Sequence, residues 1–211
     1  LGFNMSLGSG INMIREPRDG RTFEYKGEDP LLAGTLAGQE LKAEKALHIV
    51  TDVKHYAVND QDAGRTTVNS IIGKRAMRES DLLAFQIALK DSGAGAVMCS
   101  YNRVNGTYAC QNPYLLTDVL KKDFGFKGFV VSDWGATEST VPAAMAGLDM
   151  EMPGNDSFGE PLKQAVQSGA VPMARLDDMV HRILRTMFDA GVVDHPPQME
   201  APNVMRGFQV A

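Results

Sequence analysis

The chain is poor in cysteine and tryptophan and contains no long apolar run. Cys99 and Cys110 are its only cysteines, and no second Cys or His pair accompanies them as a zinc site requires, so no metal site is predicted. One disulfide in an oxidising compartment and two half-buried thiols stay open as equal alternatives. No apolar stretch approaches the roughly 20 residues that span a bilayer, so we expect no membrane partner.

The chain also lacks clustered positive charge and a complete phosphate-binding loop. Its net charge is −5, and no stripe of Lys and Arg stands against this balance, so nucleic acid is not an expected partner. Gly8 and Gly10 begin a glycine-rich pattern, but the third glycine is missing and no helix follows, so no cofactor is predicted. An uncharged or weakly charged substrate fits this composition better.

The two ends of the chain bear on the boundaries of its domain. Residues 1–13 lack the basic segment and the small-residue cleavage site of a signal peptide. The chain opens at Leu1 within an apolar, strand-like run and without an initiator Met, which indicates a missing N-terminal portion. The tail from His195 onward is rich in proline and typical of a linker. We therefore predict one domain over residues 1–193 and a linker over residues 194–211.

Between these ends, strand-like and helix-like segments alternate, which predicts parallel strands joined by helical crossovers. A doubly wound sheet is the alternative, but the missing phosphate loop argues against it. We predict an α/β fold, a (β/α)8 TIM-like barrel of which about five strand-helix units are present and about three strands are absent. The predicted strands cover residues 3–13, 48–56, 94–101, 128–132 and 147–153, and the predicted helices cover 30–46, 80–90, 113–124, 138–146 and 176–187.

Asp133 is the most informative residue of the chain. It follows the apolar run 129–131, which is typical of a strand buried on both faces, and it precedes Trp134 and Gly135. In barrels of parallel strands, the carboxyl ends of the strands carry the active site. A carboxylate at this position is therefore a candidate catalytic group, although an Asp here also suits the cap of a following helix.

Other polar and aromatic residues follow the ends of neighbouring predicted strands. Fixed hydrogen-bond donors with aromatic rings around one carboxylate suit a sugar, because hydroxyls take charge-assisted hydrogen bonds and the apolar sugar face rests on a ring. Each residue alone also has an ordinary structural interpretation, as a solvated loop residue, a backbone partner or a core residue. The candidate substrate-binding residues are Arg21, Lys54, His55, Arg65, Met98, Tyr101 and Trp134.

The chain resembles family 3 of the glycoside hydrolases, the β-glucosidase type. Several ordered motifs carry this resemblance over residues 2–190, and together they are much more specific than any one alone. The matching stretches are residues 16–21, 23–25, 28–30, 53–56, 98–102, 104–106, 128–134 and 147–154. The family branch that removes N-acetylglucosamine has a Pro-Gly-His-Gly-like stretch where this chain has residues 56–61, and this departure favours a glucosidase.

The resemblance implies that Asp133 is the catalytic nucleophile of a retaining enzyme and that the other candidates surround the glucosyl unit. In such a mechanism, two carboxyl groups lie roughly 5–5.5 Å apart. The family's acid/base glutamate usually comes from a second α/β domain, which would follow the linker and is absent from this chain. We interpret the remaining candidates as structural: Glu24, Glu28, Glu138 and Glu151.

The sequence thus predicts an exo-acting β-glucosidase that forms a covalent intermediate on Asp133. The expected partners are a β-glucoside, a cello-oligosaccharide or a laminari-oligosaccharide, and the remaining portions of the same enzyme; a homodimer stays open. A periplasmic or secreted location is favoured over a cytoplasmic one. Two alternatives are kept, namely a non-catalytic sugar-binding barrel and an aldolase-like barrel that forms a Schiff base on Lys54.

Overall fold

A computed structural model of the protein describes residues 2–199 and 203. Its main sheet has four strands in the order β1-β2-β4-β7, and all neighbouring strands are parallel. This is the arrangement of one part of a (β/α) barrel, as the sequence predicted. Most of the predicted linker, residues 200–202 and 204–211, lies outside the described residues. The strands of this sheet are β1 (Met5–Ser6), β2 (Val50–Tyr56), β4 (Ala96–Cys99) and β7 (Phe129–Ser132).

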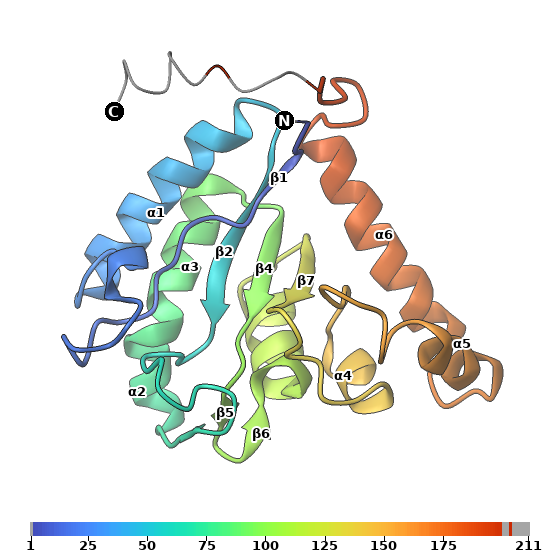
Figure 1. Cartoon of the computed structure of the whole chain (residues 1–211), viewed down its shortest axis with the longest axis horizontal. Coiled ribbons are helices and arrows are strands. Elements are labelled where there is room, and N and C mark those ends of the chain that lie inside the picture. The colour runs from blue at the N-terminus through green and yellow to red at the C-terminus, as the bar shows by residue number, and fades with distance from the viewer. Residues whose placement is uncertain (1, 200–202, 204–211) are drawn as a thin grey trace.

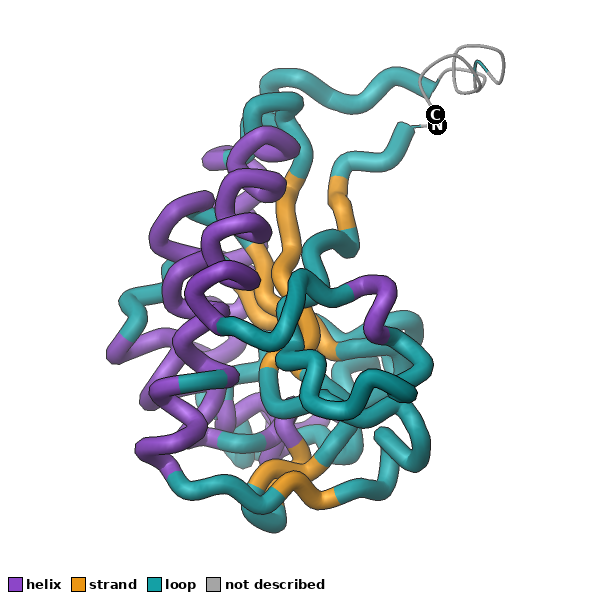
Figure 2. Tube along the Cα trace, turned by 90° about the vertical axis from the view of Figure 1, so that its left-hand side faces the viewer, coloured by secondary structure: helices purple, strands orange, loops and turns teal. Residues whose placement is uncertain are grey.

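The helices cover one face of the strands, while loops occupy the other side (Figures 1 and 2). The strands β2, β4 and β7 point toward the same end of the molecule, where the long loops and the short strands β5 (Arg103–Val104) and β6 (Thr107–Tyr108) lie (Figure 1). None of the helices in the described part is long and apolar enough to cross a bilayer. The helices are α1 (Pro30–Lys45), α2 (Lys74–Glu79), α3 (Asp81–Ser92), the π-helix η3 (Tyr114–Asp123), α4 (Val141–Ala146), α5 (Glu160–Gln167) and α6 (Met173–Asp189).

Helix α1 shows how local sequence sets this layer. The Asp29 carboxylate caps it by accepting a hydrogen bond from the Leu32 amide at 2.8 Å, and a proline follows at the first helical position. Gly34 and Gly38 lie on its buried face. A Cβ at Gly34 would stand 2.7 Å from the carbonyl oxygen of Ala84, so the glycine permits the close packing of α1 against α3.

Apolar side chains fill both faces of the strands. One core lies between the sheet and the helices and includes Val53, Tyr56 and Phe85. A second, smaller core on the opposite face includes Val50 and Met98. Because successive strand residues point to opposite faces, the two cores follow the alternation along β2 and β4.

Two predicted strands are shorter in the structure. The segment 3–13 forms only β1 and a single bridge between Gly10 and Lys54. The predicted fifth strand, 147–153, is reduced to one bridge between Met150 and Val131, so the described part of the sheet has four strands rather than five. Glycine and asparagine interrupt the first segment, and they are poor strand formers.

The region between β2 and α3 is more ordered than predicted. The expected polar connection 66–78 contains strand β3 (Asn69–Ser70) and most of helix α2. Ser80 directly precedes α3, and its hydroxyl oxygen lies 2.8 Å from the carbonyl oxygen of Ala76 and 2.6 Å from the Asp81 carboxylate, the two acceptors within its reach in the described residues. The helix therefore begins without a side-chain cap.

Cys99 and Cys110 form a disulfide, which decides the alternative that the sequence left open. The bond joins the end of β4 to the short 3-10 turn that follows strands β5 (Arg103–Val104) and β6 (Thr107–Tyr108). The two cysteines are 11 positions apart, and Tyr101, one of the candidate site residues, lies in the loop between them. The loop after β4 is therefore fixed at both ends.

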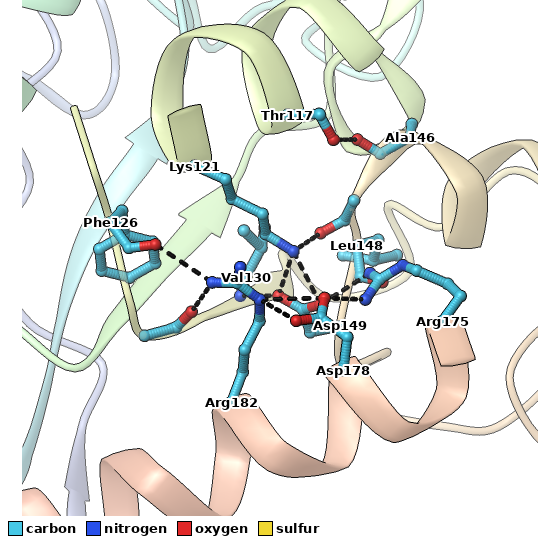
Figure 3. A network of polar contacts seen from close by, with 12 residues as sticks. Thr117, Lys121, Phe126, Val130, Ala146, Leu148, Asp149, Arg175, Asp178 and Arg182 are labelled. Atoms are coloured by element: carbon cyan, nitrogen blue, oxygen red, sulfur yellow. Dashed lines mark hydrogen bonds and ion pairs between the residues drawn. The ribbon is translucent and has the colours of Figure 1, made fainter. Parts of the chain in front are cut away.

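A buried ion network attaches α6 and η3 to the strand that carries Asp133 (Figure 3). The fully buried carboxylate of Asp149 accepts hydrogen bonds from Lys121 Nζ at 2.8 Å and from Arg175 Nη2 at 2.7 Å. It also accepts one from the backbone amide of Val130 in β7 at 2.8 Å. The network thus connects two helices to the backbone of β7.

Candidate active site

The candidate residues gather at the carboxyl ends of three neighbouring strands. Lys54 and His55 lie in the last three residues of β2, Tyr101 lies two residues after β4, and Asp133 directly follows β7. Arg21 comes from the long loop after β1 and directly precedes the 3-10 turn η1 (Thr22–Glu24). Parallel strands place these ends at one edge of the sheet, which is why distant sequence positions meet here.

The carboxylate of Asp133 has one oxygen held and one oxygen free. Its Oδ1 accepts a hydrogen bond from the Trp134 amide at 2.8 Å, and its own amide donates to the Cys99 carbonyl at 3.0 Å. Its Oδ2 is buried and has no hydrogen-bond partner among the described residues. The closest ion-pair atom to this oxygen is Nε2 of His55, at 3.5 Å. Fixed backbone and one free oxygen are what a carboxylate nucleophile needs.

His55 is neutral in this setting. Burial, together with the positive charges of Arg21 and Lys54, lowers the pKa of His55 to about 3. Its contact with Asp133 is therefore not an ion pair at neutral pH. Its neutral imidazole lies beside the free oxygen of Asp133 and can form a hydrogen bond with a sugar hydroxyl.

Asn12 holds His55 in place, and the sequence did not single it out. The Asn12 side chain donates to the His55 carbonyl at 2.9 Å and accepts from the His55 amide at 2.8 Å. Its Oδ1 also lies 3.3 Å from Nδ1 of the ring. An Nδ1–H bond to this oxygen leaves Nε2 unprotonated and facing the mouth of the site.

Glu24 joins the two cations nearest to β2. Arg21 donates from Nε to Oε2 of Glu24 and from Nη2 to Oε1 at 2.9 Å, and Lys54 Nζ lies 3.4 Å from the same Oε1. Burial opposes the charged form of Glu24, but the hydrogen bond and charge of Arg21 outweigh it and lower the pKa of Glu24 to about 2. Glu24 was interpreted as structural from the sequence, and the structure places it inside the candidate site.

Arg65 and Tyr101 form the opposite wall. The guanidinium of Arg65 lies 4.8 Å from the centre of the Tyr101 ring and is held by Asp62 at 2.9 Å. The Tyr101 hydroxyl donates to the carbonyl of Trp134 at 2.9 Å. Burial and the neighbouring Asp133 carboxylate raise the pKa of Tyr101 to about 12, so its hydroxyl stays protonated.

Met98 and Trp134 differ in exposure. Met98 is buried in the smaller core and pairs in register with Val131, so it lies below the mouth of the site. Trp134 is 40 % exposed beside Asp133, which leaves its ring free to meet a ligand. Of the eight candidates, the structure therefore brings all except Met98 to the open edge of the sheet.

In the described part of the chain, neither Asp52 nor Glu24 is placed to act as a proton donor beside Asp133. Asp52 lies two residues before Lys54 on the same face of β2, is fully buried, and burial raises its pKa well above its ordinary value. Its position within the sheet keeps it from reaching a glycosidic oxygen. Glu24 is ionised and engaged with two cations. Among residues 2–199 and 203, no group of three acidic, His or Cys side chains is arranged to hold a metal ion.

Beside this site, a cavity of about 1110 Å³ is lined by Arg15 and Asp60. Arg15 binds Asp60 through Nε at 2.8 Å and Asp81 through Nη2 at 2.7 Å. Burial, and next the negative charge of Asp81, raise the pKa of Asp60 from its ordinary 3.8 to about 7. The Asp60 carboxyl therefore changes charge near neutral pH.

The raised pKa of Asp60 predicts a loss of stability as the pH rises. Because the folded state holds this proton more tightly than the unfolded state, the contribution is full below about pH 4 and is lost as the pH rises through about 7. Asp60→Asn should remove up to about 3 kcal/mol of the difference between pH 5 and pH 8. Urea unfolding at both pH values measures it, with the exposed Asp123→Asn as control. An unchanged pH dependence in Asp60→Asn would contradict the assignment.

This geometry agrees with the motifs and can be set beside known proteins. Residues 1–186 match the family described as Glycosyl hydrolase family 3 N terminal domain. The chain belongs to this family. The family membership that the sequence predicted is thereby confirmed, and so is the fold, because solved members superpose closely on the described strands and helices.

Two curated relatives of family 3 illustrate the likeness. The chain is 42 % identical over 206 residues to "Beta-glucosidase B" of Emericella nidulans, covering 96 % of this chain and 24 % of the relative. It is 42 % identical over 185 residues to "Thermostable beta-glucosidase B" of Acetivibrio thermocellus, covering 87 % of this chain and 24 % of the relative. The chain thus spans about a quarter of the length of these relatives.

Solved structures of family 3 agree with the fold. A beta-glucosidase from Chaetomella raphigera gives a TM-score of 0.92 at 36 % identity, over 100 % of this chain and 32 % of that one. The beta-glucosidase 3B of Thermotoga neapolitana, solved in complex with glucose, gives a TM-score of 0.89 at 34 % identity. This match covers 97 % of this chain and 30 % of that one.

Proposed function

We propose that this family 3 chain is the nucleophile-bearing part of a retaining, exo-acting β-glucosidase. The observation that carries the proposal is Oδ2 of Asp133, a buried carboxylate oxygen without a hydrogen-bond partner in the described part of the chain. Polar side chains that suit sugar hydroxyls surround this oxygen. The names of the relatives, which are β-glucosidases, support the same activity.

The proposed reaction has two steps. In the first step, Oδ2 of Asp133 attacks the anomeric carbon of the terminal glucosyl unit, and the bond to the leaving oxygen breaks. That oxygen takes its proton from an acid supplied by the rest of the enzyme. In the second step, water attacks the anomeric carbon from the opposite face and gives a proton to that same acid group, now acting as a base. The bond to Asp133 breaks, so that glucose leaves and Asp133 becomes free again.

The residues around Asp133 have distinct roles in this proposal. Arg21, Lys54 and Arg65 donate charge-assisted hydrogen bonds to sugar hydroxyls. Neutral His55 exchanges one through Nε2, and the exposed ring of Trp134 offers an apolar surface for the sugar face. β-Glucosides and cello- or laminari-oligosaccharides are the proposed substrates, and we propose a periplasmic or secreted location.

A Schiff-base function for Lys54 fits this geometry less well. A Schiff base requires a free amine, whereas Lys54 Nζ is engaged by the Glu24 carboxylate at 3.4 Å. The following experiment distinguishes the proposed glucosidase from a non-catalytic sugar-binding barrel, because binding without bond cleavage would leave Asp133 unmodified.

A fluorinated glucoside with a good leaving group tests the proposal on the 211-residue chain itself. We expect 2,4-dinitrophenyl 2-deoxy-2-fluoro-β-glucoside to label Asp133, because dinitrophenolate leaves without a proton donor and the fluorine slows release of the ester. Mass spectrometry of peptides locates the label. Asp133→Asn is the control and should stay unlabelled. Labelling at another carboxylate, such as Glu24 or Asp52, would overturn the assignment.

A further inference from the structure

Glu24 is placed to organise the sugar-binding cations, a role that the family motifs did not assign to it. It lies three residues after Arg21, across the single turn of η1, and Lys54 reaches it from β2. The three side chains are largely buried, with 19 %, 20 % and 15 % exposure for Arg21, Glu24 and Lys54. In the part of the chain that the structure describes, Glu24 is the anion that forms an ion pair with each of them.

Arg21 meets Glu24 in a fork-on-fork arrangement. Its Nε and Nη2 donate to the two different carboxylate oxygens of Glu24. This pairing fixes the plane of the guanidinium as well as its position. The third guanidinium nitrogen, Nη1, does not donate to Glu24 and is left for another acceptor.

Lys54 is held by the same carboxylate at one oxygen only. Its Nζ lies 3.4 Å from Oε1, the oxygen that also accepts from Arg21 Nη2. A lysine side chain has high rotamer entropy, and burial without an anionic partner is unfavourable for its charge. Glu24 therefore keeps two like charges close together beside Asp133, where they would otherwise repel each other.

We propose that Glu24 is a positioning residue that aligns Arg21 and Lys54 for the hydroxyls of the sugar. The proposal rests on the proposed glucosidase function. Glu24 itself does not touch the reacting atoms, and its ionised, doubly engaged carboxylate does not serve as a proton donor. Its removal should weaken sugar binding while leaving the nucleophile intact.

Glu24→Gln separates these effects. One amide oxygen still accepts at the Oε1 position, but the amide nitrogen then faces Arg21 Nε–H, so that two donors oppose each other. Glu24→Asp keeps both acceptors on a side chain shorter by one methylene. Glu16→Gln is the matched control, since Glu16 pairs with Arg18 on the same loop and both are much more exposed.

The experiment measures inactivation of the 211-residue chain by the fluorinated dinitrophenyl glucoside and the Kd of glucose. Glu24→Gln should lower kinact/KI by about 10- to 100-fold, mostly through KI, and raise the Kd of glucose in parallel. Glu24→Asp should recover part of this loss, and Glu16→Gln should match the unaltered chain. The melting temperatures of all variants should agree within about 3 °C, which separates positioning from a general loss of structure.

Three outcomes would contradict the proposal or its basis. If the reagent inactivates Glu24→Gln and Glu16→Gln at the same rate and both variants bind glucose with the same Kd, Glu24 does not position the cations. If Glu24→Gln lowers the melting temperature and kinact together with an unchanged KI, its role is structural. If the unaltered chain forms no label, the proposed nucleophile fails, and the glucose titrations still decide whether Glu24 sets sugar affinity.

Discussion

Asp133→Ala should reduce turnover of aryl β-glucosides by about 10⁴-fold or more in the complete enzyme that we propose. The variant loses the only carboxylate oxygen that is both buried at the strand end and free of hydrogen bonds in the described residues. The fold should survive, because Asp133 makes one side-chain hydrogen bond, to the next amide. Steady-state kinetics and circular dichroism measure the two expectations.

A small external nucleophile makes this prediction sharper. The alanine side chain leaves space beside His55, and azide can enter it and attack the anomeric carbon of dinitrophenyl β-glucoside. The product should be α-glucosyl azide, since one displacement inverts the centre that two displacements retain. Asp123→Asn, an exposed carboxylate far from the strand ends, should behave as the unaltered enzyme. An Asp133→Ala enzyme that keeps more than about one tenth of its activity would exclude the covalent mechanism.

Local patterns were enough to locate Asp133 and the strand ends. The apolar run before Asp133 has no alternation, which is typical of a strand buried on both faces, and β7 is buried at all four positions. The spacing of Leu176, Met179 and Ile183 likewise predicted the last helix, and α6 covers these positions. Barrel geometry then followed, because parallel strands bring their carboxyl ends together.

The roles of Glu24 and Asn12 were not predictable in the same way. Glu24 lies in a 3-10 turn of three residues, and its partner Lys54 is 30 positions away, so its function depends on the packing of η1 against β2. Asn12 lies in a segment without regular structure, and its hydrogen bonds to His55 span 43 positions. An acidic residue three positions after Arg21 was the one local signal, and surface helices show the same spacing.

The predicted lengths of two strands were wrong for a physical reason. Residues 3–13 and 147–153 have apolar residues interrupted by glycine and polar residues, and each pairs with a neighbour on one side only in the described sheet. An edge segment gains half the ladder hydrogen bonds of a central strand, so short irregularities end its pairing early. The segment 147–153 instead contacts β7 through the side chain of Asp149, which accepts a hydrogen bond from a backbone amide of that strand.

Asp149→Ala should lower the free energy of unfolding by about 3–5 kcal/mol. The carboxylate is fully buried and receives hydrogen bonds from Lys121, Arg175 and the Val130 amide (Figure 3). Its removal leaves Lys121, at 8 % side-chain exposure, without an anionic partner in the described residues, and leaves Arg175, at 13 %, with Asp178 as its remaining ion-pair partner there. Urea unfolding of the 211-residue chain at neutral pH measures the loss.

A second substitution separates the cost of unpaired charge from the loss of packing. Lys121→Met in the Asp149→Ala background removes the cation that lost its anionic partner, so it should recover about 1–2 kcal/mol, although Lys121→Met alone should be destabilising. The exposed pair of Lys122 and Asp118 on the same helix is the control, and breaking it should cost less than about 1 kcal/mol. If Asp149→Ala costs no more than that control, the network does not anchor β7. In that case the fixed position of Asp133 depends on the strand ladder alone, on its hydrogen bonds to β4 and to residues 149–152.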